Sequence, residues 1–171
     1  MIHMVNIGHT ALLETTFAVL DLETSGGSPQ SGAGITEIGV VKVRGGQQLG
    51  TFQSFVDPGH PLPVFITELT GITDQMLISA PFIDEVLPTL FEFLGPADHT
   101  VLVAHNSPFD LSFLKAAARV HEYEWPEYTT IDTARLARAV LDRDEVPNCK
   151  LGTLAQFFNA NTSPNHRALD D

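Results

Sequence analysis

Two carboxylates stand one residue apart early in the chain, at Asp21 and Glu23, inside an otherwise apolar run. Side chains of a β-strand alternate between its two faces, so these carboxylates would lie side by side, with Leu20 and Leu22 on the opposite face. Each carboxylate raises the pKa of the other unless a positive charge neutralises both. A hard divalent cation, which prefers oxygen ligands, would do this. The pair therefore predicts a metal site, and a solvated turn is the alternative for the pair taken alone.

Further acidic residues that could join this pair come much later in the chain. Asp110 falls in the first turn of a helix predicted to begin at Ser107, and Asp170 and Asp171 end the sequence. Two cations about 4 Å apart, bridged by carboxylates, can prepare a water nucleophile and stabilise the leaving oxygen of a phosphodiester. His166 could take the proton from that water. For Asp110 taken alone, the alternative is an acidic residue at a helix N-terminus, where it interacts favourably with the helix dipole. For His166 taken alone, the alternative is an ordinary surface histidine.

Three motifs around these residues resemble those of a known family. They are Asp21-Leu22-Glu23-Thr24, Asn106 with Phe109-Asp110, and His166 with Asp171. In order and spacing they are similar to the exonuclease motifs of the DEDD family, histidine subclass. That family includes the proofreading epsilon subunit of bacterial DNA polymerase III, RNase T and oligoribonuclease. The resemblance covers residues 16–171 and includes a secondary match at Glu37-Ile38-Gly39.

The resemblance implies an RNase H-like fold and 3′→5′ exonuclease activity with two divalent cations, Mg²⁺ or Mn²⁺. By matched position, His166 would be the general base, and the metals would be held by Asp21, Glu23, Asp110 and Asp171. Asp171 is matched rather than Asp170 because the family places four residues between the histidine and the last aspartate. Residues that would meet the substrate, on the same grounds, are Thr24, Ser25, Gly26, Ile66, Leu69, Asn106 and Phe109.

The expected substrate is a single-stranded DNA 3′ end, in proofreading or repair. An RNA exonuclease that trims 3′ ends, like RNase T or oligoribonuclease, is the first alternative. A non-catalytic module that docks a polymerase or repair partner is the second. We also expect a DNA polymerase or a repair domain as a partner, carried on the same longer chain.

The spacing of apolar residues predicts an α/β fold with a mixed sheet, in which three antiparallel strands precede parallel ones and helices flank the sheet. The expected strands are residues 16–22, 35–43, 48–56, 101–104 and 128–132, and the expected main helices are residues 82–94, 107–122, 133–141 and 151–158. Pro88 predicts a kink or a second start in the first of these helices. In the helix from residue 107, Phe113, Leu114, Ala117 and Val120 are expected to face inward.

Length and composition limit the remaining possibilities. The 171 residues suit a short lead-in (residues 1–15) and one domain (residues 16–171), which we expect to be truncated before the end of its last helix. The net charge of −12 argues against a non-specific nucleic-acid binder with a basic face, but not against an enzyme acting on nucleic acid. One cysteine excludes an internal disulfide. No apolar run is long enough to span a membrane, so a cytoplasmic location is expected.

Overall fold

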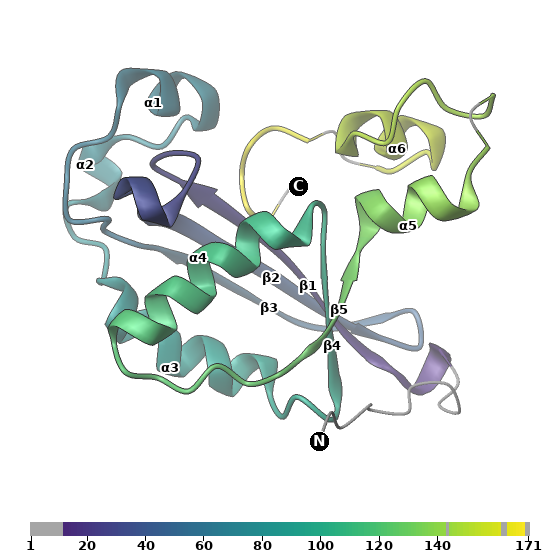
Figure 1. Cartoon of the computed structure of the whole chain (residues 1–171), viewed down its shortest axis with the longest axis horizontal. Coiled ribbons are helices and arrows are strands. Elements are labelled where there is room, and N and C mark those ends of the chain that lie inside the picture. Colours follow the sequence, from purple (N-terminus) through teal and green to yellow (C-terminus); the bar gives the residue numbers. More distant parts are fainter. Residues whose placement is uncertain (1–11, 143, 162–163, 170–171) are drawn as a thin grey trace.

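The computed structural model describes residues 12–142, 144–161 and 164–169, which form a five-stranded sheet flanked by helices (Figure 1). The strands are β1 (Thr16–Thr24), β2 (Ile35–Arg44), β3 (Gln47–Phe55), β4 (Thr100–Ala104) and β5 (Thr129–Asp132). Their order across the sheet is β3-β2-β1-β4-β5. The first three strands pair antiparallel, β4 runs parallel to β1, and β5 runs parallel to β4. The predicted mixed sheet is confirmed.

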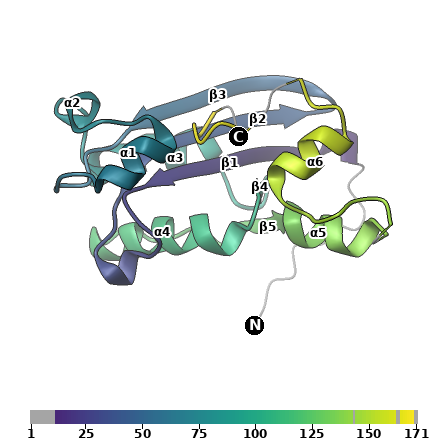
Figure 2. The same ribbon diagram turned by 90° about the horizontal axis from the view of Figure 1, so that it is seen from above.

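Six α-helices are found in the described part of the chain. They are α1 (Val64–Thr70), α2 (Asp74–Leu77), α3 (Ile83–Leu94), α4 (Ser107–Val120), α5 (Thr133–Val140) and α6 (Leu151–Phe157). Short 3-10 turns lie at η2 (Leu12–Glu14) and η3 (Pro29–Ser31). After α6 the chain returns over β1 and β2, as the yellow segment in Figure 2 shows. Within the described residues, none of these helices has the length and apolar content needed to cross a bilayer.

The core lies on one face of β1 and β2. Leu20 and Leu22 of β1 are 2% and 5% exposed, and they belong to one cluster with buried leucines of α3 and with Phe113 and Leu114 of α4. Burial of these side chains is the main favourable contribution to folding. Because side chains alternate along a strand, this packing leaves Asp21 and Glu23 on the opposite face, as predicted.

Helix α3 passes through Pro88 without a second start. Proline has no N–H to donate to the carbonyl four residues earlier, which here belongs to Asp84. The hydroxyl of Tyr123, which follows α4, donates a hydrogen bond to that carbonyl at 3.3 Å. A side chain from another segment therefore supplies the donor that the proline lacks, which lets one helix span residues 83–94.

The prediction for the last turn of α4 is wrong. Phe113 and Leu114 are buried as expected, but Val120 is 70% exposed, and Ala118 is buried instead. All of residues 119–124 are exposed, so the end of α4 extends past the core. Spacing gives the inward face of a helix, but it does not show where the neighbouring sheet ends.

Candidate functional site

Carboxylates from separate segments of the chain meet in one pocket of about 340 Å³. Asp21 and Glu23 come from β1, Asp110 comes from α4, and His166 comes from the segment after α6. The other residues that line the pocket are Leu22, Thr24, Gly26, Gly27, Phe65, Ile66, Leu69, Thr70, His105 and Phe109. Asp171, the fourth expected ligand, lies outside the described residues, as does Asp170.

The position of the first two carboxylates follows from the pairing of β1 with β2. Asp21 lies opposite Gly39, and Glu23 lies opposite Glu37. The register shifts between Glu23 and Thr24, at the end of the ladder. Irregularities of this kind re-aim side chains and are common next to active sites. The ladder therefore fixes both carboxylates on one face, and the shift begins the loop that borders the pocket.

Asp110 is the most deeply buried of these acids, at 3% exposure. Burial raises the pKa of its carboxyl to about 7, although hydrogen bonds from the backbone of Asp110 itself and of Leu22 act in the opposite direction. The nearby charge of Asp132 raises the pKa further. A carboxyl with this pKa is easily kept ionised by a cation, because an opposite charge favours the ionised form.

Of the three predicted substrate contacts at the end of β1 and in the loop after it, two line the pocket and one does not. Thr24 and Gly26 line the pocket, and the Thr24 hydroxyl donates to the Gly26 carbonyl at 2.8 Å. The Ser25 hydroxyl instead accepts from the backbone N–H of Gly34 at 2.9 Å and lies 3.3 Å from Nε2 of His60. Ser25 is not among the described residues that line the pocket. Its hydroxyl connects the two ends of the loop through the hydrogen bond with Gly34.

Asn106 is also absent from the described lining residues, although its neighbours Phe109 and Asp110 are present. It occupies the N-cap position of α4 with a left-handed backbone (φ 65°), a region that asparagine tolerates better than most residues. Its backbone N–H donates to Oδ1 of Asp132 at 3.1 Å. Asn106 therefore shapes the turn that brings Asp110 to the pocket.

Helix α1 contributes a residue that the sequence did not single out. Phe65 is 59% exposed and Leu69 is 51% exposed, and both line the pocket. Ile66, predicted together with Leu69, is only 5% exposed, so its side chain belongs mainly to the interior. The Phe109 ring packs against Phe113 with ring centroids 5.1 Å apart. An apolar residue in a seven-residue helix gives no signal of its exposure, which is why Phe65 was missed.

His105 also lines the pocket and was not among the predicted site residues. Its Nδ1 lies 3.0 Å from the Thr133 hydroxyl, and it borders both this pocket and an apolar cavity between α5 and α6. Burial lowers the pKa of its imidazole. The neutral ring therefore predominates near pH 7.

The donor set of the pocket fits hard divalent cations, because carboxylate oxygens are their preferred ligands. No lysine or arginine occurs among the described lining residues, so the pocket offers Asp110 no permanently charged cationic partner there. As the side chains stand, no group of three His, Cys, Asp or Glu within the described residues is close enough to hold an ion. The chemistry of the donors fits, and the predicted fourth ligand lies beyond the described part.

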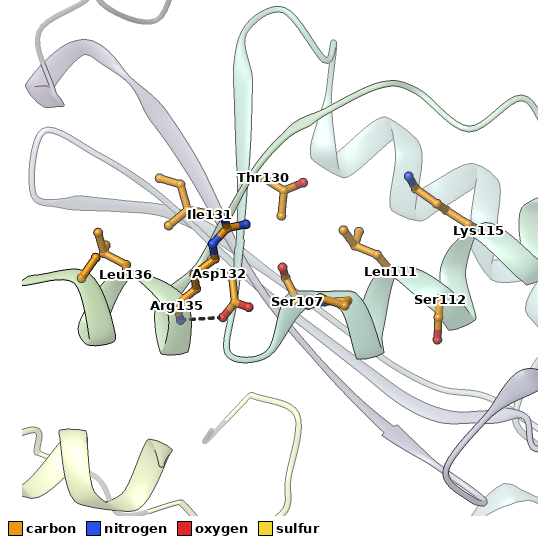
Figure 3. Close-up of a pocket in the computed structure, with 11 residues that line it drawn as sticks. Ser107, Leu111, Ser112, Lys115, Thr130, Ile131, Asp132, Arg135 and Leu136 are labelled. Atoms are coloured by element: carbon orange, nitrogen blue, oxygen red, sulfur yellow. Dashed lines mark hydrogen bonds between the residues drawn. The ribbon is translucent and has the colours of Figure 1, made fainter. Parts of the chain in front are cut away.

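A larger groove of about 780 Å³ lies between α4, β5 and α5 (Figure 3). Asp132 is the one carboxylate among its described lining residues. That carboxylate caps α5 by accepting hydrogen bonds from the backbone N–H groups of Ala134 at 3.0 Å and Arg135 at 3.2 Å. These bonds give Asp132 a structural role. The groove lacks the paired acids of the smaller pocket.

The raised pKa of Asp110 predicts a pH-dependent effect of its substitution. The folded-state pKa of about 7 exceeds the unfolded value. The wild-type protein therefore loses stability as the pH rises from the unfolded pKa to about 7, because the buried carboxyl must then ionise. In metal-free protein, the free energy of unfolding of Asp110→Asn relative to wild type should therefore be greater at pH 8 than at pH 5, by on the order of 2–3 kcal/mol. Urea unfolding with a chelator at both pH values measures this.

Glu127→Gln is the matched control, because Glu127 is exposed in the loop before β5. It should change stability equally at the two pH values. If Asp110→Asn also shows no difference between pH 5 and pH 8, the buried carboxyl does not titrate as described.

Comparison with known proteins identifies the family. The RNase T exonuclease family model matches residues 18–171. A protein of Mycobacterium tuberculosis (strain CDC 1551 / Oshkosh) named as a bifunctional exonuclease/endonuclease is 51% identical over 166 residues, which are 94% of this chain and 25% of that protein. The PolC-type DNA polymerase III of Caldanaerobacter subterraneus is 44% identical over 161 residues, 94% of this chain and 11% of the polymerase. The chain thus spans a quarter or less of either relative.

Solved structures show the same fold. Exonuclease X in complex with 5′ overhanging duplex DNA superimposes with a TM-score of 0.69 at 24% identity, covering 90% of this chain and 82% of that one. E. coli exonuclease I in complex with a dA16 oligonucleotide gives 0.77 at 18% identity, covering 92% and 38%. One exonuclease I complex with single-stranded DNA contains zinc, and exonucleases of this family generally use divalent metal ions. The match over residues 18–171 shows that the chain belongs to the RNase T family of exonucleases, which are nucleic-acid hydrolases.

Proposed function

We propose that residues 16–171 form a metal-dependent 3′→5′ exonuclease domain that hydrolyses phosphodiester bonds at single-stranded DNA ends. The observation that carries this proposal is the meeting of Asp21, Glu23, Asp110 and His166 in one pocket. These residues lie in three segments far apart in the sequence. The predicted chemistry needs all of them at one place, and family membership favours the same reaction.

Two Mg²⁺ or Mn²⁺ ions, held by Asp21, Glu23, Asp110 and Asp171, would supply a water of lowered pKa and stabilise the charge that develops on the phosphate. The protein's own contribution is to hold the carboxylates on rigid elements. Asp21 and Glu23 are fixed by the β1–β2 ladder, and Asp110 is fixed by α4. The role of Asp171 rests on its spacing from His166.

His166 is the proposed general base. It is exposed at the pocket, so its imidazole can exchange protons with solvent after each cycle. A neutral imidazole can accept the proton of the attacking water at neutral pH, which is the usual role of a histidine in such sites. No serine or cysteine nucleophile is needed.

Phe65 and Leu69 are the proposed contacts for the terminal bases, with Phe109 beside them. Aromatic and apolar side chains bind unpaired bases by stacking, which tolerates any sequence. A pocket of about 340 Å³ has the size of a small-molecule site, which suits one terminal nucleotide better than a duplex. We also propose that the backbone at Thr24 and Gly26 meets the terminal sugar.

DNA is favoured over RNA because several relatives are PolC-type DNA polymerases III. This chain covers 11% of each of them, so we propose that the domain works beside a polymerase or repair domain on a longer protein. In a bacterial cell that role implies a cytoplasmic location.

The direct test is cleavage of matched 5′-labelled DNA and RNA oligomers with Mg²⁺ or Mn²⁺. We expect a ladder that shortens from the 3′ end on DNA, no cleavage with a chelator, and no cleavage of circular single-stranded DNA. Asp21→Ala should abolish cleavage with little loss of stability, because removing one of two neighbouring carboxylates relieves repulsion.

A strong preference for the RNA oligomer would replace DNA by RNA as the substrate. If neither oligomer is cut with metal present, the domain is a docking module and the proposal fails. Marked destabilisation of Asp21→Ala without metal would show that the side chain supports the fold.

His166→Ala should slow cleavage by roughly 10²–10⁴-fold, the usual contribution of a general base. His99→Ala is the matched control, because the His99 side chain is 78% exposed next to Asp98, in the loop before β4, and should cleave at the wild-type rate. Single-turnover rates measure the effect. An unchanged rate for His166→Ala would remove this residue from the mechanism.

Phe65→Ala should weaken binding of single-stranded DNA by roughly 10-fold or more, because stacking contributes about 1–3 kcal/mol per base. Phe82 is the control: it is 51% exposed but lies at the start of α3, outside the pocket. The dissociation constant for a short oligomer, measured by fluorescence anisotropy with Ca²⁺ in place of Mg²⁺, should change for Phe65→Ala alone. Equal effects of the two substitutions would show that Phe65 is not a substrate contact.

A further inference from the structure

Glu37 is a carboxylate with no exposed surface, placed near the start of β2. Burying a charge is unfavourable unless it is paired and hydrogen-bonded. The guanidinium of Arg167 donates to both of its oxygens, from Nε to Oε2 and from Nη2 to Oε1, each at 2.9 Å. Gln53 donates to Oε1 at 2.8 Å, and the backbone N–H of Ala168 donates to Oε2 at 3.3 Å. Burial raises the pKa of Glu37, but these bonds outweigh it and lower the pKa overall.

The ion pair joins residues 130 positions apart in the sequence and attaches the end of the chain to the sheet. Residues 164–169, here called the C-terminal segment, lie over β1 and β2 (Figure 2). The Arg167 guanidinium also lies over the Phe55 ring, 5.4 Å from its centroid. A planar guanidinium with two parallel hydrogen bonds has one favoured orientation, which a lysine ammonium does not impose.

Gly39 provides a second, independent contact with the same segment. A Cβ atom built on Gly39 would lie 2.2 Å from the carbonyl oxygen of Ala168 and 2.7 Å from the backbone nitrogen of Leu169. The backbone of the C-terminal segment therefore occupies the space that any other residue would fill. Only glycine at this position lets the segment lie directly on β2.

These two contacts lie beside the catalytic carboxylates. Glu37 pairs with Glu23 and Gly39 with Asp21 in the β1–β2 ladder, so all four residues share one face of the sheet. His166 directly precedes Arg167 and has a left-handed backbone, with φ 61°. A non-glycine residue keeps this conformation only where its surroundings fix it. The bidentate ion pair at the next residue is one such restraint.

We propose that Glu37 and Arg167 are positioning residues for catalysis, which hold the C-terminal segment on Gly39 so that His166 faces the site formed by Asp21 and Glu23. This inference rests on the proposed exonuclease function. Neither Glu37 nor Arg167 is among the described residues that line the pocket. Their effect on the reaction passes through the C-terminal segment, which carries His166 and leads in the sequence to Asp171, five residues after His166.

The test uses three changes in the whole chain. Glu37→Gln combined with Arg167→Ala removes the pair without leaving a buried charge unpaired, since a single substitution would leave one. Arg167→Lys keeps the charge but loses the bidentate geometry. Gly39→Ala displaces the segment while keeping both side chains of the ion pair, and Gly152→Ala is its control, because a Cβ there meets nothing within 4 Å.

We expect kcat on single-stranded DNA to fall by roughly 10²-fold in the double variant and in Gly39→Ala, the usual cost of a misplaced catalytic group, while KM stays within about threefold. Arg167→Lys should lie between these variants and wild type, and Gly152→Ala should match wild type. Hydrogen exchange followed by mass spectrometry should show faster exchange in a peptide covering residues 164–169, with β1 and β2 still protected.

Two results would overturn the inference. If exchange rises throughout the sheet and kcat falls only with the fraction unfolded, the pair is a structural element of the fold. If the C-terminal segment exchanges faster while kcat is unchanged, its position does not matter for catalysis. If the wild-type protein cuts neither DNA nor RNA, the proposed function and this inference both fail. If the wild-type protein and the variants cut DNA equally well, this inference alone fails.

Discussion

The alternation of side chains along β1 is the constraint on which the rest of the structure depends. Leu20 and Leu22 must enter the core, and this requirement alone places Asp21 and Glu23 on the other face. A shift of one residue in the pairing with β2 would exchange the two faces, burying the acids and exposing the leucines. The hydrophobic effect therefore sets the geometry of the acidic pair.

Two buried acidic residues, Glu37 and Asp110, have pKa values shifted in opposite directions. Glu37, on the same face as Asp21 and Glu23, is neutralised by an arginine from the far end of the chain. Asp110 is only 3% exposed, yet its pKa is raised to about 7 because burial is not offset by a lysine or arginine among the described residues of the pocket. Groups whose pKa is shifted by burial in a cleft are typical of functional sites. One carboxylate thus attaches the C-terminal segment to the sheet, and the other is suited to a cation from solution.

The sequence predicts the strands and helices well because the signals for them lie within a few neighbouring residues. The alternation in β1, the glycine turn between β2 and β3, and the proline in the first turn of α4 all act within a few residues, and the corresponding elements are observed. The meeting of Asp21, Glu23, Asp110 and His166 could be predicted from motif order. The exposure of Phe65 and Val120 could not, because it depends on where other elements end. The bond from Arg167 to Glu37 spans 130 residues, and neither residue alone indicates its partner.

We propose that Asp21, Glu23 and Asp110 form the fixed part of a two-metal site. The most direct measurement is a crystal structure of the protein soaked in Mn²⁺, with anomalous diffraction data collected at the manganese edge. Our account predicts two anomalous peaks about 4 Å apart, in contact with the carboxylates of Asp21, Glu23 and Asp110. An anomalous map with no peak in this pocket, at Mn²⁺ concentrations that support cleavage, would contradict it.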